Sequence, residues 1–425
     1  MGPLIVSADA RHLVYESGKP FFYLADTAWE LLHRLDRDAT SIYLHDRATK
    51  GFTVIQTVIL AEHEYSRPNA DGFLPLVDND PAHPTDGYFA HVDWAVHEMN
   101  SLGLYAGLLP TWGDKWNTLW GAGPEIFTPE NAFTYGHFLG ERYHHADVIW
   151  ILGGDRPIES DLHRAITNAM AAGIRHGDGG RGLITFHPPG QRCSSEWFHD
   201  APWLNFNMAQ TGHKRDRDNY TTIAADYARI PVKPCIDAEP GYEDHPNDFD
   251  ASKGYLNDYD VRKAAYWSVF SGACGHTYGC HPIWQFAQRG WSPVTHPQHE
   301  WLEAKDLPGA SQVQHLRHLV ESRSPLKGIP DQSLIVGNSG NSGEHIAAMR
   351  ADDGSYAFAY SPIGATVTVN MNLLPCGRYD VSWMDPRTGG FCIAGHVDAT
   401  ATVNFTPPTT GDGQDWVLVL DRATT

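Results

Sequence analysis

The sequence predicts a (β/α)8 TIM barrel followed by a small antiparallel β-sandwich domain, an α/β fold class. Eight short apolar runs alternate with helical patterns between residue 20 and about residue 290. After about residue 330 the helical pattern fades and a strand-like alternation of apolar and polar residues begins. The 425 residues suffice for a barrel of roughly 250 to 330 residues and a smaller second domain.

Each of the eight runs is almost continuously hydrophobic at its start, as expected of parallel strands that are covered on both faces. The runs are PFFYLADTAW (20–29), FTVIQTVILAE (52–62), LYAGLLPTW (104–112), VIWILGGDR (148–156), GLITFHPPG (182–190), WLNFNMAQTGH (203–213), KPCIDAEPGYE (233–243) and GHTYGCHPIW (275–284). A doubly wound sheet is the alternative, but no G-x-G-x-x-G motif follows any run.

Helices are predicted between the runs, over residues 38–51, 87–103, 130–145, 159–177 and 257–272. Asp38 and Asp86 stand where the N-caps of the first two helices are expected. Gly51, Gly103 and Gly177 stand at expected helix C-caps. Eight strand–helix units in series favour a closed barrel.

The second domain is predicted from four strand-like segments, at 344–362, 366–374, 379–390 and 415–421. We place the boundary near 325–333 and assign residues 1–328 to the barrel and 329–425 to the β-sandwich. We expect the second domain to cap or brace the barrel, and carbohydrate binding is the alternative.

Composition limits the partners of the chain. Hydrophobic residues make up 42% and charged residues 19%, which favours a large core over disorder. The formal net charge of −20 argues against nucleic acid or an anionic membrane as the main partner, because both repel an acidic surface. No apolar stretch reaches 18 residues, so no membrane span is expected.

The N-terminal segment lacks the basic region and apolar run of a signal peptide. We expect a cytoplasmic protein, or a secreted or periplasmic one if a leader was removed. The six cysteines lack C-x-x-C spacing, so a zinc ribbon or redox motif is not expected. Cys274 and Cys280 could pair, but free buried thiols are the preferred interpretation.

The candidate active site comes from polar residues at the ends of the runs, because TIM barrels place their active sites at the carboxyl ends of the strands. Asp155 ends the fourth run and Glu239 lies in the end of the seventh. Strands three steps apart in an eight-stranded barrel face each other across the mouth. Paired carboxylates among aromatic residues are the pattern of glycoside hydrolysis, in which one acid protonates the leaving oxygen and the other attacks or stabilises the anomeric carbon.

Both carboxylates also have a structural interpretation. Asp155 could be an N-cap or the partner of Arg156, and Glu239 could form an ion pair at a strand end. Gly153-Gly154 favours the catalytic interpretation of Asp155, because two glycines let backbone and substrate approach closely. Asp237, two residues before Glu239, is the chief alternative for the role of Glu239.

Further polar and aromatic residues at the run ends are candidates for substrate binding. Amides, imidazoles and charged groups could hydrogen-bond sugar hydroxyls, and indole rings could stack on sugar rings, although each could equally be a packing residue. The candidates are Asp26, Trp29, Glu64, Trp112, Arg156, His187, Asn207, Gln210, Asp237, His276, Tyr278 and Trp284.

A metal-dependent hydrolase is an alternative that would use His63, Glu64, His187 and His276. The stretch AEHEY at 61–65 lacks H-E-x-x-H spacing, so we expect neither a metal nor another cofactor.

Five motifs together resemble the apiosidase-like glycoside hydrolases, family 140 in the carbohydrate-enzyme classification. They are FFYLADTAWELLHRL, GFTVIQTVIL, VIWILGGDRP, DAEPGYE and GACGHTYGCHPIWQF. The C-terminal segment is similar to the small β-domain that follows the barrel in many of those proteins, so the resemblance covers nearly the whole chain.

The resemblance implies a (β/α)8 barrel and a retaining double displacement. The acid/base Asp of the family's Gly-Gly-Asp motif matches Asp155, and the nucleophile Glu of its Ala-Glu-Pro motif matches Glu239. The wider retaining clan instead carries a Glu after Asn as its acid/base, so substrate geometry is expected to differ. The implied activity releases apiose, a branched furanose, from a pectic side chain. Arabinofuranosidase or xylosidase activity, or non-catalytic sugar binding, are the alternatives.

Overall fold

The computed structural model describes residues 2–337, 339–340 and 342–423. The eight predicted runs form eight parallel strands around a barrel, in the predicted order along the chain. The strands are β4 (Tyr23–Thr27), β5 (Val54–Leu60), β6 (Tyr105–Thr111), β7 (Val148–Gly153), β8 (Leu183–His187), β10 (Asn207–Gln210), β11 (Cys235–Asp237) and β12 (Gly275–Tyr278).

The sheet is nearly closed, which excludes the doubly wound alternative. Hydrogen-bonded neighbours run in the order β8-β7-β6-β5-β4-β12-β11-β10, and β9 (Arg192–Cys193) pairs antiparallel with β10. The gap between β8 and β10 is bridged by the amide of Asn205, which donates to Ile184 O over 2.8 Å. The hydroxyl of Thr185 also donates to Phe206 O over 2.7 Å.

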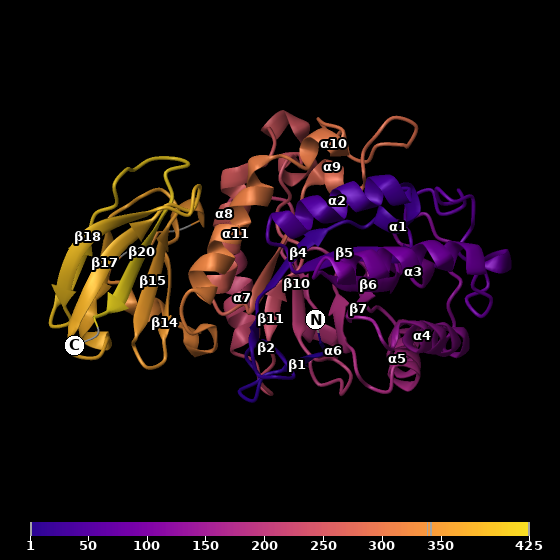
Figure 1. Ribbon diagram of the computed structural model, residues 1–425, viewed down its shortest axis with the longest axis horizontal. Coiled ribbons are helices and arrows are strands. Elements are labelled where there is room, and N and C mark those ends of the chain that lie inside the picture. The colour runs from indigo at the N-terminus through magenta and orange to yellow at the C-terminus, as the bar shows by residue number, and fades with distance from the viewer. Residues whose placement is uncertain (1, 338, 341, 424–425) are drawn as a thin grey trace.

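Helices follow the strands and cover the outside of the barrel (Figure 1). They are α1 (Leu31–Arg34), α2 (Arg37–Thr49), α3 (Asp86–Ser101), α4 (Pro129–Tyr143), α5 (Asp161–Gly177), α6 (Ser195–Phe198), α7 (Asn219–Tyr227), α8 (Asp258–Phe270), α9 (His281–Trp284), α10 (Trp301–Ala304) and α11 (Pro308–Glu321).

Three predicted helix caps are wrong by one or two residues. Asp36, and not Asp38, caps α2 by accepting from Ala39 N over 2.9 Å. Thr85 precedes α3, which begins at Asp86. Gly177 is the last residue of α5. Several neighbouring polar residues can cap the same helix, so spacing in the sequence gives the end of a helix only to within one or two residues.

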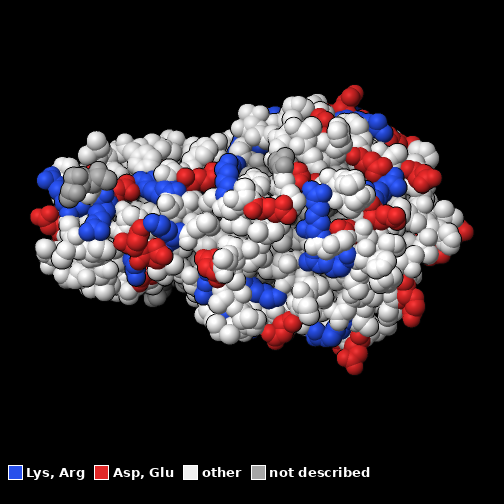
Figure 2. Space-filling model, turned by 60° about the horizontal axis from the view of Figure 1, so that its bottom comes forward, with Lys and Arg blue, Asp and Glu red and all other residues white. Residues whose placement is uncertain are grey.

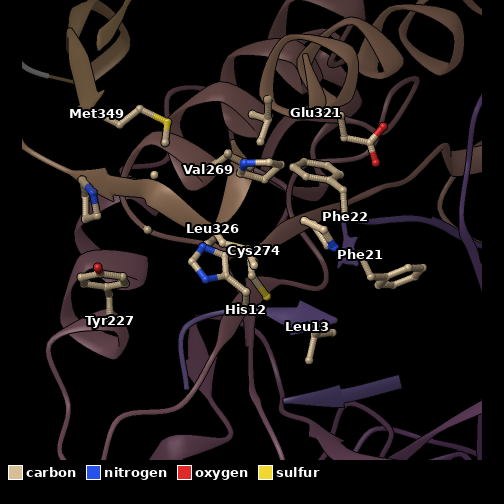
Figure 3. Close-up of a pocket in the computed structure, with 17 residues that line it drawn as sticks. His12, Leu13, Phe21, Phe22, Tyr227, Val269, Cys274, Glu321, Leu326 and Met349 are labelled. Carbon is tan, nitrogen blue, oxygen red and sulfur yellow. The ribbon is translucent and has the colours of Figure 1, made fainter. Parts of the chain in front are cut away.

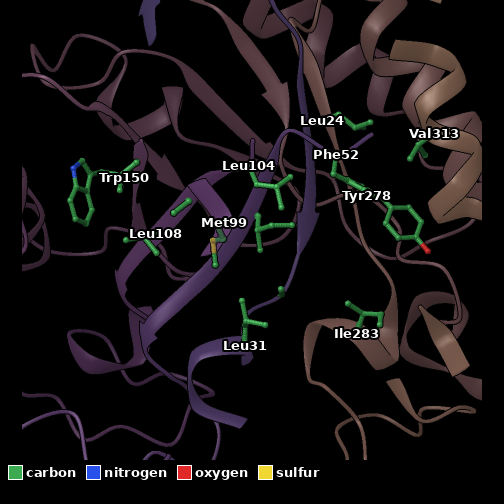
Figure 4. Packing of buried hydrophobic residues seen from close by; sticks show 14 of the residues in the cluster. Leu24, Leu31, Phe52, Met99, Leu104, Leu108, Trp150, Tyr278, Ile283 and Val313 are labelled. Atoms are coloured by element: carbon green, nitrogen blue, oxygen red, sulfur yellow. The ribbon is translucent and has the colours of Figure 1, made fainter. Parts of the chain in front are cut away.

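Side chains alternate along the barrel strands and separate two apolar layers. Inside the barrel lie Tyr23, Val54, Ile149, Leu183 and Ile236. Between the strands and the helices lie Leu24, Ile55, Trp150 and Ile184, with part of this outer layer drawn in Figure 4. A small antiparallel sheet of β1 (Leu4–Val6), β2 (Leu13–Tyr15) and β3 (Pro20–Phe21) adds Leu4, Leu13 and Phe21 to the inner layer.

The C-terminal part is a six-stranded antiparallel sheet with a two-stranded sheet packed on one face. The larger sheet has the order β13 (Gly328–Pro330), β14 (Ala347–Ala351), β15 (Tyr356–Ser361), β20 (Trp416–Arg422), β17 (Arg378–Met384) and β18 (Phe391–Asp398). The smaller sheet pairs β16 (Val367–Asn370) with β19 (Thr402–Phe405). Strands β18 and β19 were not predicted from the sequence.

The two faces of the large sheet have different partners. Ala357 and Ala359 pack with the small sheet, whereas the alternate residues Phe358 and Tyr360 pack against the barrel. Figure 1 shows α8 and α11 beside this sheet. The ring of Tyr360 stacks on that of Tyr266 in α8, with centroids 4.8 Å apart. This shared core supports a bracing role for the C-terminal part.

A small pocket lies along the same seam, near the amino ends of β3 and β12 (Figure 3). Apolar side chains such as Leu13, Phe22 and Met349 line it, together with the thiol of Cys274. Glu321 is the single carboxylate among its lining residues, so this pocket does not hold the predicted pair of acids.

All six cysteines are free thiols, and four of them are buried. Within the described residues, no helix is long and apolar enough to cross a membrane. On the face drawn in Figure 2, acidic and basic side chains are interspersed.

A buried ion pair between Arg262 of α8 and Asp415, next to β20, links the barrel to the C-terminal sheet. Arg262 Nη2 and Nε donate to the two carboxylate oxygens over 2.9 and 3.2 Å. Asp415 also accepts from the hydroxyl of Tyr360 over 3.2 Å, and Arg262 and Asp415 are 1% and 0% exposed.

Replacing Asp415 with Ala is expected to lower the free energy of unfolding by about 3 kcal/mol, because it leaves Nη2 and Nε of the buried Arg262 without a carboxylate and only Asp258 paired with Nη1. Urea denaturation measures this loss. The matched control is Asp380→Ala, which removes the exposed pair with His396 in the same domain and should cost under about 1 kcal/mol. Equal losses in the two variants would contradict the role of the buried pair.

Candidate active site

Three consecutive residues with positive φ bring Asp155 to the end of β7. Gly153, Gly154 and Asp155 have φ values of 95°, 94° and 60°. A Cβ on Gly153 would lie 2.4 Å from His187 O. A Cβ on Gly154 would lie 2.6 Å from Gly113 N. The two glycines therefore make room for the backbone of the neighbouring strands, which is one of the two close approaches expected from the sequence.

The Asp155 carboxylate is partly buried, with 22% of its side chain exposed. Trp120 Nε1 and Arg156 Nη1 donate to its Oδ2 atom over 3.1 and 3.2 Å. Arg156 also donates to Glu62 Oε1 over 2.8 Å, so its charge is shared between two carboxylates. Burial and then the negative charge of Glu239 raise the pKa of Asp155 to about 6, although Arg156 opposes the shift.

Glu239 follows β11 and is buried between two histidines. His187 Nε2 lies 3.0 Å from Glu239 Oε2, and His213 Nε2 lies 3.1 Å from Oε1. Burial by itself raises the pKa of Glu239, but the close contacts of His187 and His213 outweigh it and lower the pKa to about 2. Between these two pKa values, Asp155 is largely protonated while Glu239 is ionised.

Trp29, Trp112 and His187 form an aromatic cluster beside Glu239. The Trp29 ring centroid lies 5.3 Å from those of both Trp112 and His187. Trp29 and Trp112 are only 4% and 6% exposed. Trp112 Nε1 and His187 Nδ1 are buried without a hydrogen-bond partner among the described residues. Buried polar atoms rarely stay unpaired, so ligand hydroxyls are natural partners for these two nitrogens.

The structure thus brings together six of the predicted residues, namely Trp29, Trp112, Asp155, Arg156, His187 and Glu239. Trp284 belongs to an adjoining group: its ring lies 5.7 Å from that of His63, and its Nε1 donates to His281 Nδ1 over 3.1 Å.

Four predicted site residues are not brought to this cluster, because side chains alternate along a strand and these four occupy outward positions. Their polar groups are held by other parts of the chain. The pairs are Asp26 with Tyr43 and Arg47, Asp237 with Thr211 and Asn219, His276 with Ser268, and Tyr278 with Glu243. Because the Asp237 carboxylate points outward, Asp237 is not placed to take the role considered for Glu239.

Two more predicted residues, Asn207 and Glu64, lie in other surroundings. Asn207 is the first residue of β10, at the opposite end from the mouth, and its Nδ2 lies 3.2 Å from His199 Nδ1. Gln210, by contrast, ends β10 at the mouth, on the same side of the strand as the inward Met208, and its Oε1 is buried without a partner among the described residues. Glu64 accepts from Arg67 Nη1 over 3.3 Å in the loop after β5.

Three residues of the site were not predicted from the sequence. His213 is the last residue of the sixth run, so the strand-end rule could have included it. Tyr242 lies inside the DAEPGYE motif, and its ring centroid is 4.3 Å from that of His213. Trp120 lies in the loop after β6, where no strand pattern points to it.

The alternative metal set of His63, Glu64, His187 and His276 is not assembled, because the imidazole of His276 contacts Ser268 Oγ of α8 over 2.9 Å. In the part of the chain that the structure describes, no group of three or more His, Cys, Asp or Glu side chains is arranged to hold a metal ion.

Known proteins match both parts of the chain. Residues 7–327 match the family model described as "Apiosidase-like, catalytic domain". Residues 329–421 match the model described as "Putative collagen-binding domain of a collagenase". No curated protein matches the sequence.

Solved structures are similar over the full length. One described as "Glycoside hydrolase" is 32% identical with a TM-score of 0.91, over 100% of this chain and 98% of the other. A glycoside hydrolase family 5 structure from Bacteroides vulgatus is 31% identical with a TM-score of 0.90, over 99% and 94%. A family 5 mannosidase from Rhizomucor miehei, 11% identical with a TM-score of 0.52 over 76% and 98%, shares the fold alone. The chain belongs to the apiosidase-like family of glycoside hydrolases.

Proposed function

We propose that this protein is a retaining glycoside hydrolase in which Asp155 is the general acid/base and Glu239 the nucleophile. The observation that carries the proposal is the opposite pKa shifts of the two carboxyl groups, to about 6 for Asp155 and about 2 for Glu239. Two neighbouring carboxyls with separated pKa values are the typical signature of an acid and a nucleophile that work together.

In the first step, Asp155 protonates the glycosidic oxygen while a Glu239 carboxylate oxygen attacks the anomeric carbon. The bond between this carbon and the leaving oxygen breaks, and the alcohol departs from a glycosyl-enzyme ester. Because Trp120 and Arg156 both donate to Asp155 Oδ2, we place the transferred proton on Oδ1.

In the second step, the Asp155 carboxylate takes a proton from water, and the water oxygen attacks the anomeric carbon. The ester bond to Glu239 breaks, which releases the sugar and restores both carboxyl groups. His187 and His213 stabilise the departing Glu239 carboxylate through the contacts that keep it ionised at rest.

For the substrate we propose a plant-type glycoside of a pentofuranose, with apiose in a pectic side chain as the first candidate, on the basis of the family. Trp112 Nε1 is available to donate to a sugar hydroxyl, and His187 Nδ1 is available to hydrogen-bond to another. Arabinofuranosides and xylosides are the alternative substrates. Non-catalytic sugar binding is less well supported, because binding alone does not require two carboxyls with opposite pKa shifts.

We assign a bracing role to the C-terminal domain, because one face of its large sheet packs on the barrel and the other on the small sheet.

Asp155→Asn and Glu239→Gln should each reduce turnover of a cleavable pentoside by at least about 10²-fold, because each removes one of the two reacting groups. Steady-state kinetics and circular dichroism measure activity and folding. Asp237→Asn is the matched control, since its carboxylate contacts Thr211 and Asn219, and it should stay within a few-fold of wild type. Near-normal activity in either of the first two variants would refute the assignment.

His213→Phe is expected to move the acidic limb of the pH profile of kcat/KM upward by about one pH unit or more, because Glu239 loses a contact that favours its charged form. The alkaline limb, set by Asp155, should remain near a pH of about 6. His144→Phe, at the exposed C-cap of α4, is the control. An unchanged acidic limb in His213→Phe would show that His213 does not tune Glu239.

A further inference from the structure

Trp120 is a large apolar side chain left open to solvent beside the proposed acid. It is 62% exposed, whereas Trp29 and Trp112 in the same site are 4% and 6% exposed. An exposed tryptophan loses the benefit of burying its ring, and such rings often mark a binding surface.

The position of the Trp120 ring is fixed by two contacts. Its Nε1 donates to Asp155 Oδ2 over 3.1 Å. The guanidinium carbon of Arg156 lies 4.5 Å from the ring centroid, in a cation–π contact with a fully buried arginine. Both contacts orient the indole at the edge of the carboxyl group that delivers the proton.

The loop that carries Trp120 is anchored on both sides of it. Thr118 N donates to Glu125 Oε1 over 2.8 Å, and this hydrogen bond joins the two ends of the loop. Gly123 N donates to Asp114 Oδ2 over 2.8 Å. Asp114 is buried and paired with the buried Lys115. The loop that carries the exposed indole is therefore held in place by hydrogen bonds and by a buried ion pair.

Gly121, next to Trp120, shows how closely this loop packs on the site. A Cβ at Gly121 would lie 2.4 Å from Arg156 Nη2, 2.4 Å from Asp114 Cβ and 3.1 Å from Glu62 Oε1. The loop thus covers the arginine directly and leaves the outward part of the neighbouring indole exposed.

We infer that Trp120 is the platform of the leaving-group subsite and that the enzyme favours substrates whose leaving group is a ring, either a sugar or an aromatic alcohol. The inference rests on the proposed function, because the side of the mouth occupied by the acid is the side on which the leaving oxygen departs. A ring attached to that oxygen would stack on the indole, while the sugar that is released lies toward Glu239.

The test compares benzyl and methyl glycosides of apiofuranose, arabinofuranose and xylopyranose, since benzyl alcohol and methanol are of similar acidity and differ in the ring. Wild type should have the higher kcat/KM for the benzyl member of the pair it cleaves. Trp120→Ala should lower kcat/KM for the benzyl glycoside at least about ten-fold more than for the methyl glycoside.

Trp120→Phe separates the ring from the N–H group. It keeps a stacking surface, so most of the preference for benzyl should return, while loss of the hydrogen bond to Asp155 should raise the alkaline limb of the pH profile for both substrates. Leu119→Ala changes the exposed neighbour in the same loop and should leave the preference unchanged.

A second readout does not depend on turnover. Saturation-transfer NMR with the benzyl glycosides and the Glu239→Gln protein should show transfer to the benzyl protons, and adding Trp120→Ala should abolish it. Equal losses for benzyl and methyl substrates, or no transfer to any benzyl group, would overturn the subsite while leaving the roles of Asp155 and Glu239 intact. Activity in Asp155→Asn or Glu239→Gln would instead overturn the proposed function.

Discussion

The burial of two neighbouring carboxyl groups in one barrel mouth is the constraint on which the site is built. Asp155 and Glu239 come from strands on opposite sides of the mouth, and the charge of Glu239 contributes to the raised pKa of Asp155. The two carboxyl groups differ in the cationic and hydrogen-bonding groups that surround them. Two histidines contact Glu239, whereas the single arginine beside Asp155 also contacts Glu62. One carboxyl therefore remains charged and the other holds a proton.

The rest of the molecule maintains this unequal pair. His187 contacts Glu239 from the last position of β8, and its carbonyl oxygen accepts from Gly154 N over 3.2 Å, so one residue links the two halves of the site. The Gly-Gly turn is required for this approach, since a Cβ at Gly153 would meet the same carbonyl oxygen. On the outside of the barrel, α8 shares its apolar and charged contacts with the C-terminal sheet.

The fold was largely predictable from the sequence, because the eight buried strands are continuous apolar runs of the right length. Asp155 and Glu239 were predicted as the reacting pair from their motifs and their positions at strand ends, and that assignment stays a prediction. Asp26, Asp237, His276 and Tyr278 were predicted in the site because the strand-end rule was applied without the two-residue alternation of side chains. His276 is one residue before the inward Thr277, whose hydroxyl accepts from Gln56 of β5 over 3.2 Å.

Other features depend on contacts that no local pattern encodes. The exposed strand β18 carries Ile393 at 90% exposure and lacks the buried alternation that identifies a strand. Trp120 reaches Asp155 from a loop 35 residues earlier in the chain. His213 and Glu239 meet only when β10 and β11 are adjacent.

The proposed role of Glu239 as the nucleophile requires a covalent glycosyl intermediate on this residue. Asp155→Asn protein should accumulate this intermediate with an activated aryl pentofuranoside, because the aryl group leaves without acid assistance while hydrolysis of the ester lacks its base. Mass spectrometry of the rapidly quenched and digested protein is the direct measurement. The account predicts a pentosyl adduct on the peptide that contains Glu239. An adduct on another residue, or cleavage with inversion and no adduct, would contradict it.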